Sequence, residues 1–167
     1  MSKVYIFIDN GSTGTIGVYG EGVREFFLTP AKECQDYTKS KKTICRVDYQ
    51  AMYDFIHDAK EKYPDLLVVM ERPMTNSKFN VNAQFSGMRA FEATLIAVEQ
   101  NNVPHMVVDS KQWQKKMLPD GLKSSAEQKK ASMQRGIELF PEFEELITKH
   151  KDADGILGAY CFFRERY

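Results

Sequence analysis

The sequence predicts an α/β protein built on a mixed five-stranded sheet with helices on both faces. Three apolar runs follow one another near the amino terminus, at residues 4–9, 14–19 and 23–29. Two more, at 66–71 and 105–109, each come after a segment with helical periodicity. Strands that alternate with helices usually pair in parallel. We therefore expect the first, fourth and fifth strands to be parallel neighbours.

Length and composition favour one domain spanning residues 1–167, large enough to bury its own core. No apolar run approaches the roughly 20 residues that cross a bilayer, and the amino terminus lacks a signal-peptide pattern. The three cysteines have no CxxC spacing, so neither a disulfide framework nor a zinc site is indicated. We expect a cytoplasmic protein with no membrane partner.

The order of elements follows from local patterns. The turn "NGSTG" separates the first two strands, and Gly20 and Gly22 predict a hairpin between the second and third. The polar segment 30–46 is expected to be irregular. Helical periodicity predicts the following helices: residues 47–63, 83–101, a short one in "SKQWQKKML", a basic one at 125–139, and a last one that opens at "DADG".

Two acidic residues, Asp9 and Glu71, stand directly after apolar strands. Functional residues of open α/β sheets collect at the carboxyl ends of parallel strands. If these strands are neighbours, about 4.8 Å apart, the two carboxylates repel each other unless a cation lies between them. Either acid alone has a structural explanation, Asp9 as a turn cap and Glu71 as a partner of Arg72. The pair, with a third acidic cluster available, favours a hard ion such as Mg²⁺.

The third acidic cluster is "HKDADG", residues 150–155. Residues three or four apart share a helix face, so Asp154 groups with His150 and Lys151. Asp152 is able to join only from the helix cap or a distorted first turn, and Asp is also a favoured N-cap. Asp154 borders the apolar face of the last helix, where an unpartnered charge is costly.

The motifs "FIDNGSTGTIGV", "VVMERP", "VPHMVVDSKQWQKKML" and "DADGILGAY" resemble, in order and spacing, the RuvC family of Holliday-junction resolvases in the RNase H-like superfamily. The closest resemblance is to small phage and viral members. It implies an RNase H-like fold in which Asp9, Glu71 and Asp154 bind the metal. The family often places a fourth ligand three residues before the last Asp, where this chain has Lys151. We expect Asp152 to substitute, with His150 as the alternative.

The resemblance also implies the activity and the partners. It implies a homodimer whose two active sites cut opposing strands of a four-way DNA junction by phosphodiester hydrolysis, in DNA recombination and repair. Each active site would use two Mg²⁺ ions, with Mn²⁺ as a possible substitute. A phage-encoded enzyme would act in the cytoplasm of a bacterial host.

Basic clusters supply candidate DNA contacts although the net charge is zero. For a base-unstacking wedge after Glu71 we nominate Phe79, with Met74 second, although Phe79 is equally well explained as a core residue. The small residues of segment 83–101 suit either dimer contact or close packing on the sheet. A second basic cluster is Lys39, Lys41 and Lys42. The phosphate contacts are predicted to be Lys115, Lys116, Lys123, Lys129 and Lys130.

Other functions share parts of this pattern. An RNase H-like nuclease acting on RNA–DNA hybrids or other branched DNA would use the same carboxylates. A junction-binding protein without catalysis needs none of them, so Asp9, Glu71 and Asp154 argue against it. The loop "DNGSTG" also resembles the phosphate-binding turn of actin-like sugar kinases, but those need two such domains and this chain is long enough for one.

Overall fold

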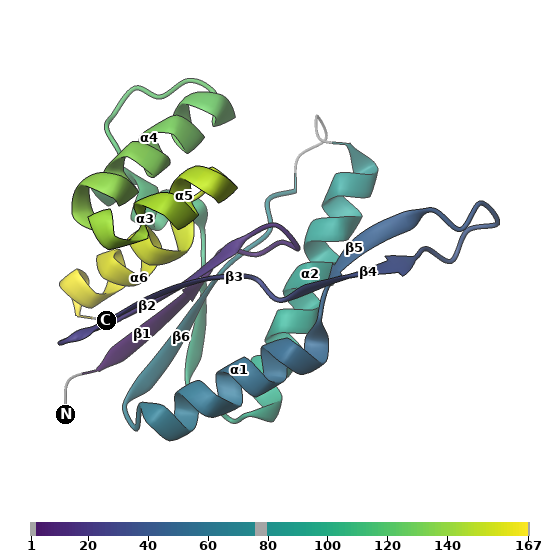
Figure 1. Ribbon diagram of the computed structural model, residues 1–167, viewed down its shortest axis with the longest axis horizontal. Helices are drawn as coiled ribbons and strands as arrows, with labels where there is room; N and C mark the ends of the chain where they lie inside the picture. Colours follow the sequence, from purple (N-terminus) through teal and green to yellow (C-terminus); the bar gives the residue numbers. More distant parts are fainter. Residues whose placement is uncertain (1–2, 76–79, 167) are drawn as a thin grey trace.

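A five-stranded mixed sheet forms the centre of the protein, in a computed structural model that describes residues 3–75 and 80–166 (Figure 1). The strand order is β3-β2-β1-β6-β7, in which β1, β6 and β7 are parallel and β2 and β3 run antiparallel to their neighbours. This confirms the predicted sheet. The strands are β1 (Val4–Ile8), β2 (Thr15–Gly20), β3 (Val23–Leu28), β6 (Leu66–Glu71) and β7 (His105–Val108).

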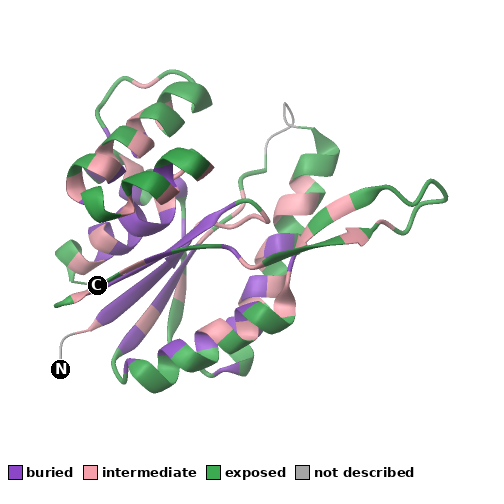
Figure 2. Ribbon diagram, in the orientation of Figure 1, coloured by how far each residue is buried: buried purple, intermediate pink, exposed green. Residues whose placement is uncertain are grey.

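Helices cover both faces of the sheet (Figure 1). Side chains alternate across β1, so Ile6 and Ile8 face one helical layer while Tyr5 and Phe7 face the other. The first layer is α1 (Tyr49–Lys62) and α2 (Val81–Gln100). The second contains α3 (Ser110–Met117), α4 (Ser125–Leu139), the 3₁₀ turn Pro141–Phe143, α5 (Glu144–His150) and α6 (Asp154–Glu165). Because both faces of β1 are buried, it reads as an unbroken apolar run (Figure 2).

The prediction that residues 30–46 are irregular was wrong. They form an antiparallel hairpin, β4 (Ala31–Gln35) and β5 (Thr43–Val47), which projects past α2 and is separate from the central sheet (Figure 1). Most of its side chains are exposed, so the sequence has no apolar alternation to reveal the strands (Figure 2). The hairpin is defined by its backbone ladder and its turn.

Close packing fixes the start of α6 against β2. A Cβ atom built at Gly155 would lie only 2.8 Å from the backbone nitrogens of Gly17 and Ile16. One built at Gly17 would lie 2.3 Å from the carbonyl oxygen of Gly155. Glycine on both sides therefore lets the first turn of α6 approach the sheet closely enough to bring its acidic residues beside the end of β1.

Two further expectations concern the chain as a whole. Within the described residues, no helix combines the length and the apolar character needed to cross a membrane. Cys34, Cys45 and Cys161 have free thiols in the structure.

Candidate metal centre

Asp9 and Glu71 follow neighbouring parallel strands at the same level. The residues before them, Ile8 and Met70, are paired in the register of β1 and β6. The backbone N–H of Asp9 is hydrogen-bonded to the carbonyl of Thr15, which fixes the turn that carries the first acid. The expectation that the two acids meet at one edge of the sheet agrees with this register.

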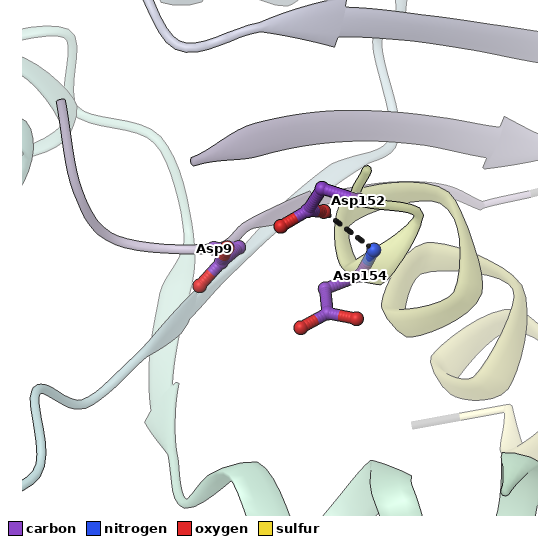
Figure 3. A group of neighbouring side chains, drawn as sticks. All are labelled: Asp9, Asp152 and Asp154. Atoms are coloured by element: carbon purple, nitrogen blue, oxygen red, sulfur yellow. Dashed lines mark hydrogen bonds between the residues drawn. The ribbon is translucent and has the colours of Figure 1, made fainter. Parts of the chain in front are cut away.

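Three carboxylates gather beside this edge, those of Asp9, Asp152 and Asp154 (Figure 3). One oxygen from each lies within 4.8 Å of the others. A Mg²⁺ ion with oxygen ligands at 2.0–2.1 Å places opposite oxygens about 4.2 Å apart. The spacing and the all-oxygen donor set therefore fit a hard divalent cation after a small closure. Glu71 lies outside this tight group but close enough for its charge to act on Asp9 and Asp154.

The electrostatics of the cluster also favour a cation. Burial, followed by the charges of Asp154 and Asp152, raises the pKa of Asp9 well above its usual value. Burial and the charge of Asp152 raise the pKa of Asp154 to about 7. The Lys129 ammonium lowers both pKa values, but by less than these effects raise them. Since like charges this close cannot all ionise at neutral pH without a counter-charge, the site is suited to a divalent ion.

Glu71 is oriented by a tryptophan. The indole Nε1 of Trp113 donates a hydrogen bond of 2.8 Å to Oε2 of Glu71. Burial raises the pKa of Glu71, and this hydrogen bond opposes the rise. Trp113 also packs its helix on the sheet, because its ring is fully buried and lies edge-on to Phe7. Its hydrogen bond to Glu71 was missed, although a buried indole N–H usually has a partner. Arg72 pairs with Asp109 and not with Glu71.

Asp152 joins the cluster from just before α6. Lys151 adopts a left-handed conformation that ends α5, and Asp152 follows it. Oδ1 of Asp152 accepts hydrogen bonds from the Thr15 hydroxyl at 2.7 Å and from the backbone N–H of Asp154 at 2.9 Å (Figure 3). Oδ1 of Asp152 is thus held by Thr15 and by the first backbone N–H of α6, and Oδ2 is left for a metal. His150, the alternative fourth ligand, ends α5 and is not part of the three-carboxylate group.

Two hydroxyl residues that the sequence did not single out hold this arrangement. Thr15 bridges β2 and α6, because its hydroxyl also accepts the backbone N–H of Gly155 at 3.0 Å. Ser132 of α4 donates its hydroxyl to Oδ1 of Asp154. Neither residue lies near the acids in the sequence, so no local pattern could have identified them.

Asn10 is a further residue that the sequence reasoning missed. Its side-chain amide donates to the backbone carbonyl of Glu71, which ties the loop after β1 to the end of β6. Its Oδ1 is buried and has no hydrogen-bond partner among the described residues. Asn10 lines a hollow of about 270 Å³ together with Glu71, Arg72 and Met74. An unpaired acceptor is therefore present beside the carboxylates.

The predicted DNA contacts lie mainly around α3 and α4. Lys129 is the one whose charge acts on the carboxylates, while Lys116 pairs with Glu165 at 2.6 Å. Phe79, the first choice for a wedge, lies outside the described residues. Met74 is exposed in the loop after Glu71. The predicted phosphate contacts Lys115, Lys116, Lys123, Lys129 and Lys130 are all exposed.

Comparison with known proteins supports the fold. No family model matches the sequence, and no curated protein matches it significantly. The structure of Thermus thermophilus RuvC in complex with a Holliday junction substrate matches with a TM-score of 0.61 and 16% identity, over 98% of this chain and 95% of that one. A second Thermus thermophilus RuvC structure matches with a TM-score of 0.53 and 13% identity, over 98% and 96%. The chain therefore has the RuvC-like, RNase H-like α/β fold.

Proposed function

We propose that the protein is a metal-dependent, structure-selective DNA endonuclease that resolves four-way junctions by paired phosphodiester hydrolysis. The observation that carries the proposal is the meeting of Asp9, Asp152 and Asp154 beside Glu71 at the carboxyl edge of the sheet. It is supported by the fold, since a protein of similar fold has been seen with a Holliday junction substrate.

The residues fit Mg²⁺, with Mn²⁺ as a substitute, because every donor is a carboxylate oxygen. Two such ions, when bound, lower the pKa of an attacking water and stabilise the leaving 3′ oxygen. Asp9, Glu71, Asp152 and Asp154 would hold them. Thr15 and Trp113 keep two of these carboxylates in place through their hydrogen bonds. Lys129 adds positive charge beside the carboxylates, where an anionic phosphate has to approach.

Branched DNA is the proposed partner. The exposed lysines of α3 and α4 would bind phosphates and fix the position of the DNA without reading its bases. The unpaired Oδ1 of Asn10, in the hollow next to Glu71, offers an acceptor to a nucleotide at the cleavage point. Phe79 and Met74 remain the proposed wedge residues. We also propose that the protein is one of the small phage and viral resolvases and acts in the cytoplasm of a bacterial host.

A homodimer is also proposed, since paired cuts need two active sites. The small residues Ala90 and Ala97 are buried inside the protomer, which corresponds to their close packing on the sheet. Another side of α2 carries exposed apolar side chains at positions 81, 88 and 96, which lie along one helical stripe with the exposed Glu92. This stripe of Val81, Met88 and Ile96 is the proposed dimer contact.

The test is cleavage of a labelled four-way junction beside matched duplex, flap and RNA–DNA hybrid substrates, in Mg²⁺ or in EDTA. We expect symmetric, metal-dependent nicks in the junction and little cutting of duplex. Asp9→Asn should abolish cutting and leave junction binding intact. Preference for the hybrid would identify an RNase H-like nuclease, and binding without cutting in any divalent metal would identify a non-catalytic junction-binding protein.

A further inference from the structure

A groove is lined by the β4–β5 hairpin and by the first half of α2, which the hairpin crosses (Figure 1). Its volume is about 950 Å³. Ser12, three residues after Asp9, lines the groove, so the groove begins at the loop that carries the metal site. Its other polar and aromatic lining includes Tyr37, Lys42, Thr43, Ser86 and Arg89.

The tip of the hairpin is an ordered turn. Oδ1 of Asp36 accepts hydrogen bonds from the backbone N–H groups of Thr38 at 3.2 Å and Lys42 at 3.1 Å, and from the Thr38 hydroxyl at 2.7 Å. The backbone N–H of Asp36 is bonded to the Lys42 carbonyl at 2.8 Å. These bonds hold the pKa of Asp36 below its usual value. The hydrogen bonds of Asp36 therefore hold the turn in place, and the neighbouring side chains of the turn are exposed.

An aromatic side chain is exposed on this turn. Tyr37 is 89% exposed, and its hydroxyl accepts a hydrogen bond of 3.3 Å from Arg46 of β5. An exposed ring on an ordered turn contributes nothing to the core of the protomer. It does provide a flat surface on which a planar group is able to stack at little cost in conformational entropy.

The charge of the hairpin is unlike that of the whole chain. Residues 30–47 contain five basic and two acidic side chains and therefore have a net charge of +3, whereas the net charge of the whole chain is zero. Lys32 is paired with Asp48. No ion pair involves Lys39, Lys41 or Arg89 within the described residues. Lys42 and Arg89 line the groove together with Asp36, and Lys39 and Lys41 flank its lining residue Ser40. This excess of positive charge favours a polyanion over a protein segment.

We propose that this groove binds a short single-stranded segment of the nucleic acid substrate as it leaves the metal centre. An aromatic platform bordered by cations and hydroxyls is the arrangement that binds unpaired bases and their phosphates. The volume lies at the upper end of small-ligand pockets, about 300–1,000 Å³, which suits a few nucleotides. This proposal rests on the proposed DNA-cleaving function, and it adds a substrate contact outside the carboxylate site.

The first experiment measures binding by fluorescence anisotropy in EDTA, so that no cleavage occurs. The probe is a four-way junction with one single-stranded extension, compared with the same junction without it. Lys39→Gln/Lys41→Gln should weaken binding of the extended junction about tenfold and lower the slope of log affinity against log salt by up to about 1.4. Binding of the junction without an extension should change less than twofold.

The matched control is Arg164→Gln/Arg166→Gln, which removes the same charge at the end of α6, next to the amino-terminal end of β1 (Figure 1). It should leave the preference for the extension unchanged. An equal loss in both double variants would mean that only general charge matters and would overturn the proposal. So would wild-type binding by Lys39→Gln/Lys41→Gln.

A second pair of variants tests the stacking platform. Tyr37→Phe keeps the ring and should bind the extended junction as the wild type does, whereas Tyr37→Ser should weaken it about fivefold or more. Equal binding by both variants would exclude stacking on Tyr37. Junction cleavage in Mg²⁺ is scored separately on the substrate without an extension. If the protein does not cleave the junction, the proposed function is wrong. If it cleaves the junction but the variants bind the extended junction as the wild type does, only the proposal for the groove is wrong.

Discussion

Trp113 and Glu71 are joined by a hydrogen bond of 2.8 Å from the indole nitrogen to the carboxylate, although 42 positions separate them in the sequence. Trp113 is fully buried on α3, and Glu71 ends β6. The bond uses Oε2 of the carboxylate and leaves Oε1 for another ligand. A core residue of one helix thereby sets the orientation of an acid at the metal centre.

Replacing Trp113 with Phe tests this relationship. The ring packing against Phe7 is largely retained, but the hydrogen bond to Glu71 is lost. Because partners that orient metal ligands typically matter by 10–100-fold, we expect a loss of this order in cleavage at low Mg²⁺, with partial recovery at high Mg²⁺. Mg²⁺ titrations of the cleavage rate measure it. Unchanged Mg²⁺ dependence in a folded variant would show that Glu71 needs no such support.

The carboxylate cluster should destabilise the protein when no metal is bound. The pKa of Asp154 is about 7 in the folded protein and 3.8 when unperturbed. Between these values the folded state holds a proton that the unfolded state releases, so stability falls as pH rises from about 4 to 7. In EDTA at pH 8, Asp154→Asn should therefore raise stability by about 1–3 kcal/mol, or roughly 2–10 °C in Tm.

The advantage of Asp154→Asn should largely disappear near pH 4, where the acid is protonated in the folded state and about half protonated in the unfolded state. Thermal unfolding of the wild type and the variant at pH 4, 6 and 8 checks the sign. Asparagine retains an oxygen that is able to accept the Ser132 hydroxyl, so the comparison isolates the charge. A variant that is less stable than the wild type at pH 8 would contradict the expected repulsion.

Metal binding should depend on pH for the same reason. Protons compete with the cation for Asp9 and Asp154, whose pKa values are raised. Mg²⁺ should therefore increase Tm more at pH 8 than at pH 6, and cleavage at subsaturating Mg²⁺ should rise with pH through about 7. Melting curves over a Mg²⁺ series at each pH measure this. An equal Mg²⁺ effect at both pH values would place the bound ion elsewhere.

Lys129, on α4, should affect the ionisation of Asp9 and Asp154. Its charge lowers the pKa of Asp9 and of Asp154, so Lys129→Gln should move the rising limb of the pH–rate profile to higher pH and slow cutting at pH 7 several-fold. Lys130→Gln is the matched control, because the Lys130 charge is not among the main causes of either pKa shift. Identical pH–rate profiles for the two variants would show that the Lys129 charge has no specific effect on the acids of the site.

The contact between α6 and β2 should tolerate no side chain at Gly155. A methyl group there would meet backbone atoms at 2.8 Å, which requires α6 and its acids to move. We expect Gly155→Ala to cost about 1–3 kcal/mol and to reduce cutting. Gly87→Ala is the control, since its Cβ would meet only the Pro73 side chain at 3.6 Å. Denaturant unfolding of both variants tests it, and equal stability would show that the contact relaxes freely.

The sequence by itself determined the sheet and the position of its acids. Strands buried on both faces are continuous apolar runs, and β1 and β6 are recognisable for that reason. Asp9 and Glu71 could be assigned to one edge because parallel strands end there together. The hairpin of residues 31–47 was missed because most of its side chains are exposed and polar, so its sequence shows no clear apolar alternation.

Only the tertiary structure decided how the acids are held and which of them meet. The choice of Asp152 over His150 in the cluster depends on the left-handed Lys151 and on Thr15, which is 137 residues away. Trp113 and Ser132 reach Glu71 and Asp154 across the packed faces of the sheet and helices. Such contacts depend on how close the elements approach, as at Gly17 and Gly155, and local periodicity carries no information about that distance.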